Sequence, residues 1–203
     1  MKKKHQEVCD ILIAWLAISF CFAIVLGGYS VLGYVKTKAF NFSWAGFLTN
    51  FGLSLIITAT SFIFHELAHK HTAIHFGGQG RFVLWPAFLL IGVVFAVLFG
   101  FIFIAPGAVY IYGKQYSKKD EGLVSLAGPA TNIIMALLFL VAGTLGAPII
   151  VISYGLFINL WIAFFNLIPI GPLDGAKIIR WNALAWVVAI AIPTILMFAF
   201  GLF

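Results

Sequence analysis

Charged side chains are scarce in this chain of 203 residues, of which 9% are charged and 63% are hydrophobic. An ordinary soluble domain, in which about a quarter of the residues are charged, is excluded by that composition. The net charge of +6 does not indicate nucleic-acid binding, because the lysines flank apolar segments. The only two cysteines, Cys9 and Cys21, have a spacing that suits neither a disulfide framework nor a metal site. The composition therefore indicates an integral membrane protein.

Long apolar runs make up most of the chain. Each has about the twenty residues that a membrane-spanning helix needs, and they lie near residues 11–35, 44–64, 83–105, 123–145, 148–168 and 183–203. We therefore predict an all-α polytopic membrane protein, a bundle of five or six transmembrane segments. The connecting loops are short and no linker is apparent, so residues 1–203 are expected to form one membrane-embedded domain without a separate soluble domain. The first run has no signal cleavage site and predicts a retained helix.

Acidic residues are the scarcest charged group, and only two of the six lie at the ends of apolar runs. The other four precede or begin the first segment, or lie in the polar loop "GKQYSKKDEG", where water solvates them. The remaining two are Glu66 and Asp174. Ionisable groups at membrane depth are costly and point to function.

Glu66 lies in the pattern H-E-x-x-H, formed by His65, Glu66 and His69. On a helix, the two histidines lie about 40° apart around the axis and one turn apart along it, so that both imidazoles can reach one zinc ion. Glu66 lies about 100° from His65 and can exchange protons beside the metal without ligating it. The alternative is a polar helix end at the membrane surface, which does not explain the spacing.

A second histidine pair follows, at His71 and His75. These residues face another side of the same helix, and no acidic residue accompanies them in the sequence. Surface polarity is the preferred interpretation, and a second metal site is the alternative.

The third zinc ligand must come from elsewhere in the chain, because a catalytic zinc site usually has three protein ligands and one open position. Asp174 is the one remaining candidate. The residues "PIGP" at 169–172 cannot continue a helix, so the segment 148–168 is expected to break there and to present Asp174 on irregular backbone. Gly175 permits close approach, and Asn166 can hydrogen-bond a freed backbone group or a substrate carbonyl. A capped, broken helix with a solvated aspartate is the alternative.

These motifs resemble those of the site-2 protease family of intramembrane zinc metalloproteases. "HELAH" is followed about a hundred residues later by "NLIPIGPLDG", and "LAGPATN" at 126–132 is similar to the small-residue motif between the two signatures. The resemblance covers about residues 50–180. It implies that His65, His69 and Asp174 bind one zinc ion, that Glu66 is the general base, and that Asn132 and Asn166 orient the substrate or shape the site. No PDZ or CBS module is apparent.

The resemblance also implies a substrate, a transmembrane protein helix that must unwind before a peptide bond can be cleaved. Pairing with a strand edge is one way to hold an unwound segment, and "RFVLWPAFLLIGVVF" is rich enough in β-branched and aromatic residues to supply one. Two other classes stay open, a membrane metal transporter and a catalytically inactive membrane scaffold. A transporter would have polar residues at several depths, and a structural zinc site would need no base. The oligomeric state is not indicated.

Membrane topology adds an independent argument. If every apolar segment crossed the membrane, HELAH and Asp174 would lie on opposite faces, so one segment must not cross. Residues 83–105 contain Pro86, Gly92 and Gly100 and are predicted to be re-entrant or hairpin-like. With a cytosolic N-terminus, only Lys36 and Lys38 then lie outside. The ten cytosolic basic residues are Lys2, Lys3, Lys4, Lys70, Arg81, Lys114, Lys118, Lys119, Lys177 and Arg180.

Full crossing would place five basic residues inside and seven outside, which the positive-inside rule disfavours. The site is therefore expected to open toward the cytosol, with Phe203 outside, in the plasma membrane of a prokaryote.

Overall fold

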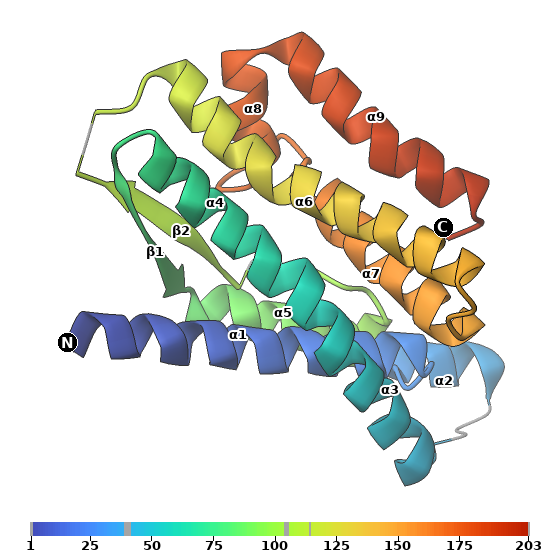
Figure 1. The fold of residues 1–203 in the computed structure, drawn as a ribbon. Helices are drawn as coiled ribbons and strands as arrows, with labels where there is room; N and C mark the ends of the chain where they lie inside the picture. Colours follow the sequence, from blue (N-terminus) through green and yellow to red (C-terminus); the bar gives the residue numbers. More distant parts are fainter. Residues whose placement is uncertain (1, 39–41, 104–105, 114, 203) are drawn as a thin grey trace. The chain divides into compact units, whose positions relative to one another are not determined.

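Helices dominate the computed structural model, which describes residues 2–38, 42–103, 106–113 and 115–202 (Figure 1). Lys114 and Phe203, which the topology argument uses, lie outside the described residues, as do the side chains of Lys2, Lys3 and Lys4. The elements are α1 (Lys2–Leu26), α2 (Val31–Thr37), α3 (Trp44–Thr58), the π-helical turn η1 (Ala59–Ile63), α4 (Phe64–His75), β1 (Gln79–Leu84), α5 (Pro86–Phe99), β2 (Gly107–Tyr112), α6 (Lys118–Thr144), α7 (Ile149–Asn166), α8 (Asp174–Trp181) and α9 (Ala183–Ala199).

Several of these helices are long and apolar enough to cross a membrane. By length and composition the described residues contain four such helices, at His5–Thr37, Trp44–His75, Lys118–Thr144 and Ile149–Asn166. Two shorter apolar helices, α5 and α9, accompany them. A mainly helical fold is thereby confirmed, its apolar helices are consistent with a membrane protein, and the count of five or six spans stays a prediction.

Two compact units make up the chain. Unit 1 comprises Met1–Ala59 and Val83–Ala108, and unit 2 comprises Thr60–Phe82 and Val109–Phe203. The chain passes from one to the other at η1 and along the two strands.

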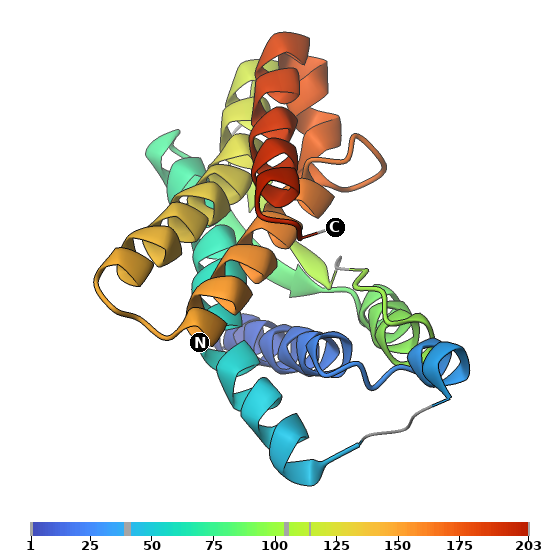
Figure 2. The same cartoon turned by 90° about the vertical axis from the view of Figure 1, so that its right-hand side faces the viewer.

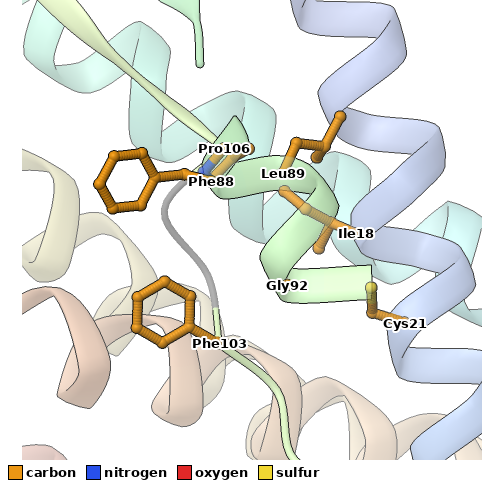
Figure 3. A pocket seen from close by; sticks show the side chains of 7 residues that line it. All are labelled: Ile18, Cys21, Phe88, Leu89, Gly92, Phe103 and Pro106. Atoms are coloured by element: carbon orange, nitrogen blue, oxygen red, sulfur yellow. The ribbon is translucent and has the colours of Figure 1, made fainter. Parts of the chain in front are cut away.

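Unit 1 is built around α1, which packs against α3 and α5. Two hydrogen bonds join α1 to α3: the indole Nε1 of Trp15 donates to the carbonyl of Leu55 at 3.0 Å, and the hydroxyls of Ser19 and Thr58 lie 2.6 Å apart. Figure 3 shows a small cavity between α1, α5 and the segment that follows α5, lined by Ile18, Cys21, Phe88, Leu89, Gly92, Phe103 and Pro106. Its volume of about 10 Å³ is about that of one water site, so it is a packing gap and not a ligand pocket.

Trp85 and Pro106 lie side by side, although helix α5 lies between them in the chain. The backbone N–H of Trp85 donates to the carbonyl of Pro106 at 2.7 Å, and at the far end of the strands Gly113 lies beside Gln79. The two strands therefore run antiparallel as a two-stranded sheet. At about 1.5 Å per residue, the 14 residues of α5 reach about 21 Å, less than the hydrocarbon core of about 30 Å.

The sheet corrects the all-α prediction. Each strand has six residues, "QGRFVL" and "GAVYIY", in which β-branched and aromatic side chains favour an extended backbone. The segment "RFVLWPAFLLIGVVF" is a strand only at its start, because Pro86 begins helix α5. Proline at the first turn suits a helix, since its missing N–H would have no partner there.

Unit 2 is centred on α6, which packs against α4, α7, α8 and α9, as Figures 1 and 2 show. A capping box begins α6, in which Ser117 and Asp120 each accept a hydrogen bond from the other's backbone. Apolar side chains of α6, α7 and α9 form one buried cluster, comprising Ala136, Leu156, Leu160 and Met197. This packing places α4, α7 and α8 against α6, and the buried polar side chains His65, His69, Asn132, Asn159 and Asp174 belong to these four helices.

Candidate metal centre

His65, Glu66 and His69 lie on the inner face of α4. All three are buried, whereas the neighbouring Phe64 and Leu67 are 44% and 37% exposed. Apolar side chains outside and ionisable ones inside suit a helix that faces lipid. The π-helical turn η1 precedes α4 directly, and such turns are frequent at functional sites because they change helical register.

Asp174 comes to the site at the start of α8. Helix α7 ends at Asn166, as the "PIGP" sequence predicts, and Gly171 takes a left-handed φ of +56° in the connection. The prediction of irregular backbone at Asp174 was wrong, because Asp174 is the first residue of α8. A carboxylate is favourable there, since the helix dipole is positive at its N-terminus.

Gly175 explains how α8 reaches this position. A Cβ atom at Gly175 would collide with the backbone carbonyls of Leu167 and Ile168. The start of α8 therefore packs directly on the end of α7, which only glycine permits. The close approach expected at this residue is present.

The three side chains converge on one point. The Nε2 atoms of His65 and His69 lie 3.0 Å apart, and one carboxylate oxygen of Asp174 lies 3.3 Å and 3.2 Å from them. Ligand atoms around a tetrahedral zinc with bonds of about 2.0–2.2 Å are separated by about 3.3–3.5 Å. Among the described residues, these are the three that could hold a metal ion together.

Hydrogen bonds at the other ring nitrogens set the protonation of both imidazoles. His69 Nδ1 lies 2.7 Å from the carbonyl oxygen of Val124, and His65 Nδ1 lies 2.5 Å from Oδ1 of Asn132. Because both partners are acceptors, both Nδ1 atoms carry hydrogen, and the two Nε2 atoms carry lone pairs. Two lone pairs and a carboxylate would repel one another without a cation, so the donor set fits zinc.

Glu66 is buried beside the triad without belonging to it. Its side chain is 9% exposed, and its Oε2 atom has no hydrogen-bond partner among the described residues. An unpartnered buried carboxylate oxygen is costly in a merely structural residue. This arrangement leaves Glu66 free to exchange a proton with a group bound at the triad.

Helix α6 packs closely against the triad at Gly128. The sequence did not reveal this contact. A Cβ atom at Gly128 would lie 2.5 Å and 2.6 Å from the Nε2 atoms of His69 and His65. Any larger residue would therefore occupy the space in front of the triad. The motif "LAGPATN" contains this glycine, so its small residues were the available signal.

Asn132 is fully buried and touches the triad through His65. Its Nδ2 group donates to the carbonyl of Ser61 at 2.7 Å and to Oδ1 of Asn159 at 3.3 Å. Asn159 was missed from the sequence, although an amide in an apolar helix was a usable signal.

The other predicted residues do not belong to the triad. Asn166 donates to the carbonyl of Ile162 in its own helix at 3.0 Å. His71 and His75 are exposed, in keeping with the surface-polarity interpretation.

Known proteins similar to this chain share a description. It is 34% identical over 195 residues to "Putative zinc metalloprotease MJ0611" of Methanocaldococcus jannaschii, covering 94% of this chain and 92% of that protein. It is 36% identical over 150 residues to "Putative zinc metalloprotease YwhC" of Bacillus subtilis, covering 62% and 67%. "Putative zinc metalloprotease Rip2" of Mycolicibacterium smegmatis is 30% identical over 148 residues, covering 63% and 57%.

No family model matches the chain, and no solved structure matches it significantly. The archaeal relative spans nearly the whole of both chains. Together with the buried triad, these relatives assign zinc as the cofactor. This chain therefore belongs to the zinc metalloprotease family that these relatives represent.

Proposed function

We propose that this protein is an intramembrane zinc metalloprotease of the site-2 protease type, which hydrolyses a peptide bond within or near a transmembrane helix of another protein. The observation that carries the proposal is the buried set of His65, His69 and Asp174 with Glu66 beside it. Apolar helices long enough to span a bilayer carry or adjoin this set, which supports a substrate that also lies in the membrane.

His65, His69 and Asp174 would hold one zinc ion per chain, which when bound polarises the scissile carbonyl and acidifies a water molecule. The remaining steps belong to the protein's own residues. Glu66 takes the proton of the attacking water and passes it to the leaving amine. Its unpartnered oxygen supports this role. Asn132 and the carbonyl of Val124 keep both imidazoles oriented throughout.

Strand β1 is a candidate for holding the unwound substrate. A helical peptide bond has its carbonyl engaged, so the substrate segment must become extended before attack. A two-stranded sheet leaves one edge of each strand without a partner strand, and an extended peptide can pair with such an edge. Asn166, near the end of α7, would orient the substrate or shape the site without binding zinc.

Cleavage by the purified protein tests the proposal. The protein is reconstituted in lipid vesicles with a single-span test substrate, and product is measured with and without a zinc chelator. Cleavage within the span that stops with chelator and returns with zinc is expected. Absence of cleavage by zinc-loaded protein would leave a transporter or an inactive scaffold as the better interpretation.

We also propose a cytosolic N-terminus and a site that opens to the cytosol. The hydrogen bond from the backbone N–H of Trp85 to the carbonyl of Pro106 supports a re-entrant segment between them. It would keep the start of α6, and with it Asp174, on the same membrane face as HELAH. The relatives come from archaea and bacteria, which supports a prokaryotic plasma membrane.

Single cysteines at Ser43 and Gln115 test this topology in a chain that lacks Cys9 and Cys21. An impermeant thiol reagent applied to intact cells should label the cysteine at Ser43 and not the one at Gln115. Labelling at Gln115 would show that residues 83–105 cross the membrane.

A further inference from the structure

The two zinc-ligand histidines are oriented by partners of different kinds. His69 donates from Nδ1 to a backbone carbonyl, that of Val124, which can only accept. His65 instead faces the side-chain amide of Asn132, and an amide can accept or donate depending on which way it is turned. The protonation of His65 therefore depends on what holds Asn132 in place.

A turned amide would disable His65 as a ligand. If Nδ2 of Asn132 faced His65, Nδ1 would have to accept, and the imidazole hydrogen would move to Nε2. That atom faces His69 and Asp174 at 3.0 Å and 3.3 Å. A protonated Nε2 has no lone pair for a metal ion, so the direction of this one amide decides whether the site can bind zinc.

Two acceptors hold Asn132 in the productive direction. One is the carbonyl of Ser61, at 2.7 Å from Nδ2, and the other is Oδ1 of Asn159, at 3.3 Å. Asn159 is itself fixed, because its own Nδ2 donates to the carbonyl of Gly155 at 2.8 Å. Both asparagines are fully buried. A chain of hydrogen bonds thus runs in one direction from His65 through Asn132 and Asn159 to a backbone carbonyl.

We propose that Asn159 is a positioning residue that fixes, through the amide of Asn132, the tautomer of His65 that can bind zinc. This inference rests on the proposed function of the triad. It assigns a role to a buried polar residue of α7 that touches neither the metal ligands nor the general base.

Replacement of Asn159 tests the proposal through zinc affinity, measured by chelator competition on the purified full-length protein. Asn159→Leu keeps the number and branching of the side-chain heavy atoms and removes the acceptor, and affinity should fall by about 10-fold or more, the range for outer-shell partners. Asn159→Ser, which is too short to reach Asn132, should also lower affinity and serves if the leucine variant does not fold. In metal-free protein, nitrogen-15 NMR should show His65 shifting from the Nδ1-protonated to the Nε2-protonated form.

The control and the double variant separate positioning from packing. Ile158→Ala, at a fully buried neighbour, should lower the unfolding temperature and leave zinc affinity unchanged. In Asn132→Asp, either carboxylate oxygen accepts from His65, so adding Asn159→Leu should change affinity less than about 2-fold. An equal loss in both backgrounds, or unchanged affinity in Asn159→Leu, would overturn the inference. Failure of the wild-type protein to bind zinc would instead overturn the proposed function.

Discussion

The buried polar side chains of the two units behave differently. In unit 1 the buried hydroxyls of Ser19 and Thr58 each bond to a carbonyl of their own helix, at Trp15 and Ser54, as well as to each other. In unit 2 the buried histidines and asparagines bond between helices, and their bonds converge on one point. A polar group that satisfies its own helix costs little in an apolar surrounding. Groups that depend on several helices specify a site.

Substitutions of two carboxylates, Asp174 and Asp120, should differ most in their effect on zinc affinity. Asp174→Ala removes a ligand and should lower zinc affinity by more than the roughly 100-fold that an outer-shell change can cost, and proteolysis should be lost with the metal. Zinc content by mass spectrometry and substrate cleavage measure both effects. The control Asp120→Ala breaks the capping box of α6, costs about 1 kcal/mol of stability, and should keep zinc. Unchanged zinc content in Asp174→Ala would rule out the proposed ligand set.

Glycines give the next contrast, with one substitution made in each unit. Gly128→Ala places a methyl group 2.5 Å from His69 Nε2, so zinc affinity should fall by about 10-fold or more. Gly52→Ala, on α3 of unit 1, meets no atom within 4 Å. It should leave zinc unchanged and stabilise the protein by about 0.4–1 kcal/mol. Normal zinc binding by Gly128→Ala would mean that α6 does not lie against the triad as described.

Gly175→Ala should act less directly. The added Cβ collides with the carbonyls of Leu167 and Ile168, which are backbone atoms and cannot turn aside. Helix α8 must therefore shift and carry Asp174 with it, at a cost of about 1–3 kcal/mol in the free energy of unfolding. Zinc affinity and thermal unfolding should both decrease. A variant that loses neither would show that Asp174 does not depend on this packing.

The smallest effect is expected in unit 1. Thr58→Val keeps the shape of the side chain and removes the hydrogen bond to Ser19, which should cost about 1 kcal/mol of stability. Zinc affinity and proteolysis should stay at wild-type values, since His65, His69 and Asp174 all belong to unit 2. A loss of zinc in Thr58→Val, measured beside Gly52→Ala, would break the contrast between the units.

Sequence patterns indicated more of the residues of the candidate metal site than of the strands around it. The spacing of His65 and His69 needs only one helix, and Asp174 followed from the scarcity of acids in apolar segments. Polar side chains are also scarce in apolar helices, so Asn159 could have been recognised in the same way, but it was not. The motif "LAGPATN" marked a stretch of small residues but not which of them faces the triad, because the role of Gly128 depends on how α6 packs against α4.

The sheet escaped prediction for a related reason. Strands β1 and β2 have six residues each and are separated by α5, so neither shows a long alternating pattern. Their pairing depends on the return of residues 85–106. The prolines and glycines in that segment indicated the return. A strand edge was expected within "RFVLWPAFLLIGVVF", whose start lies in β1, but β2 and its pairing with β1 were not expected.

Glu66→Gln separates the general base from the zinc ligands, because Glu66 is buried in unit 2 and does not belong to the triad. The wild-type and variant proteins are purified in parallel, and zinc per chain and cleavage of a single-span substrate in vesicles are measured on the same samples. We expect about one zinc ion in each protein and cleavage by the wild type alone, since an amide cannot accept the proton of the attacking water. Loss of zinc from the variant would place Glu66 among the ligands, and cleavage at the wild-type rate would contradict its role as the base.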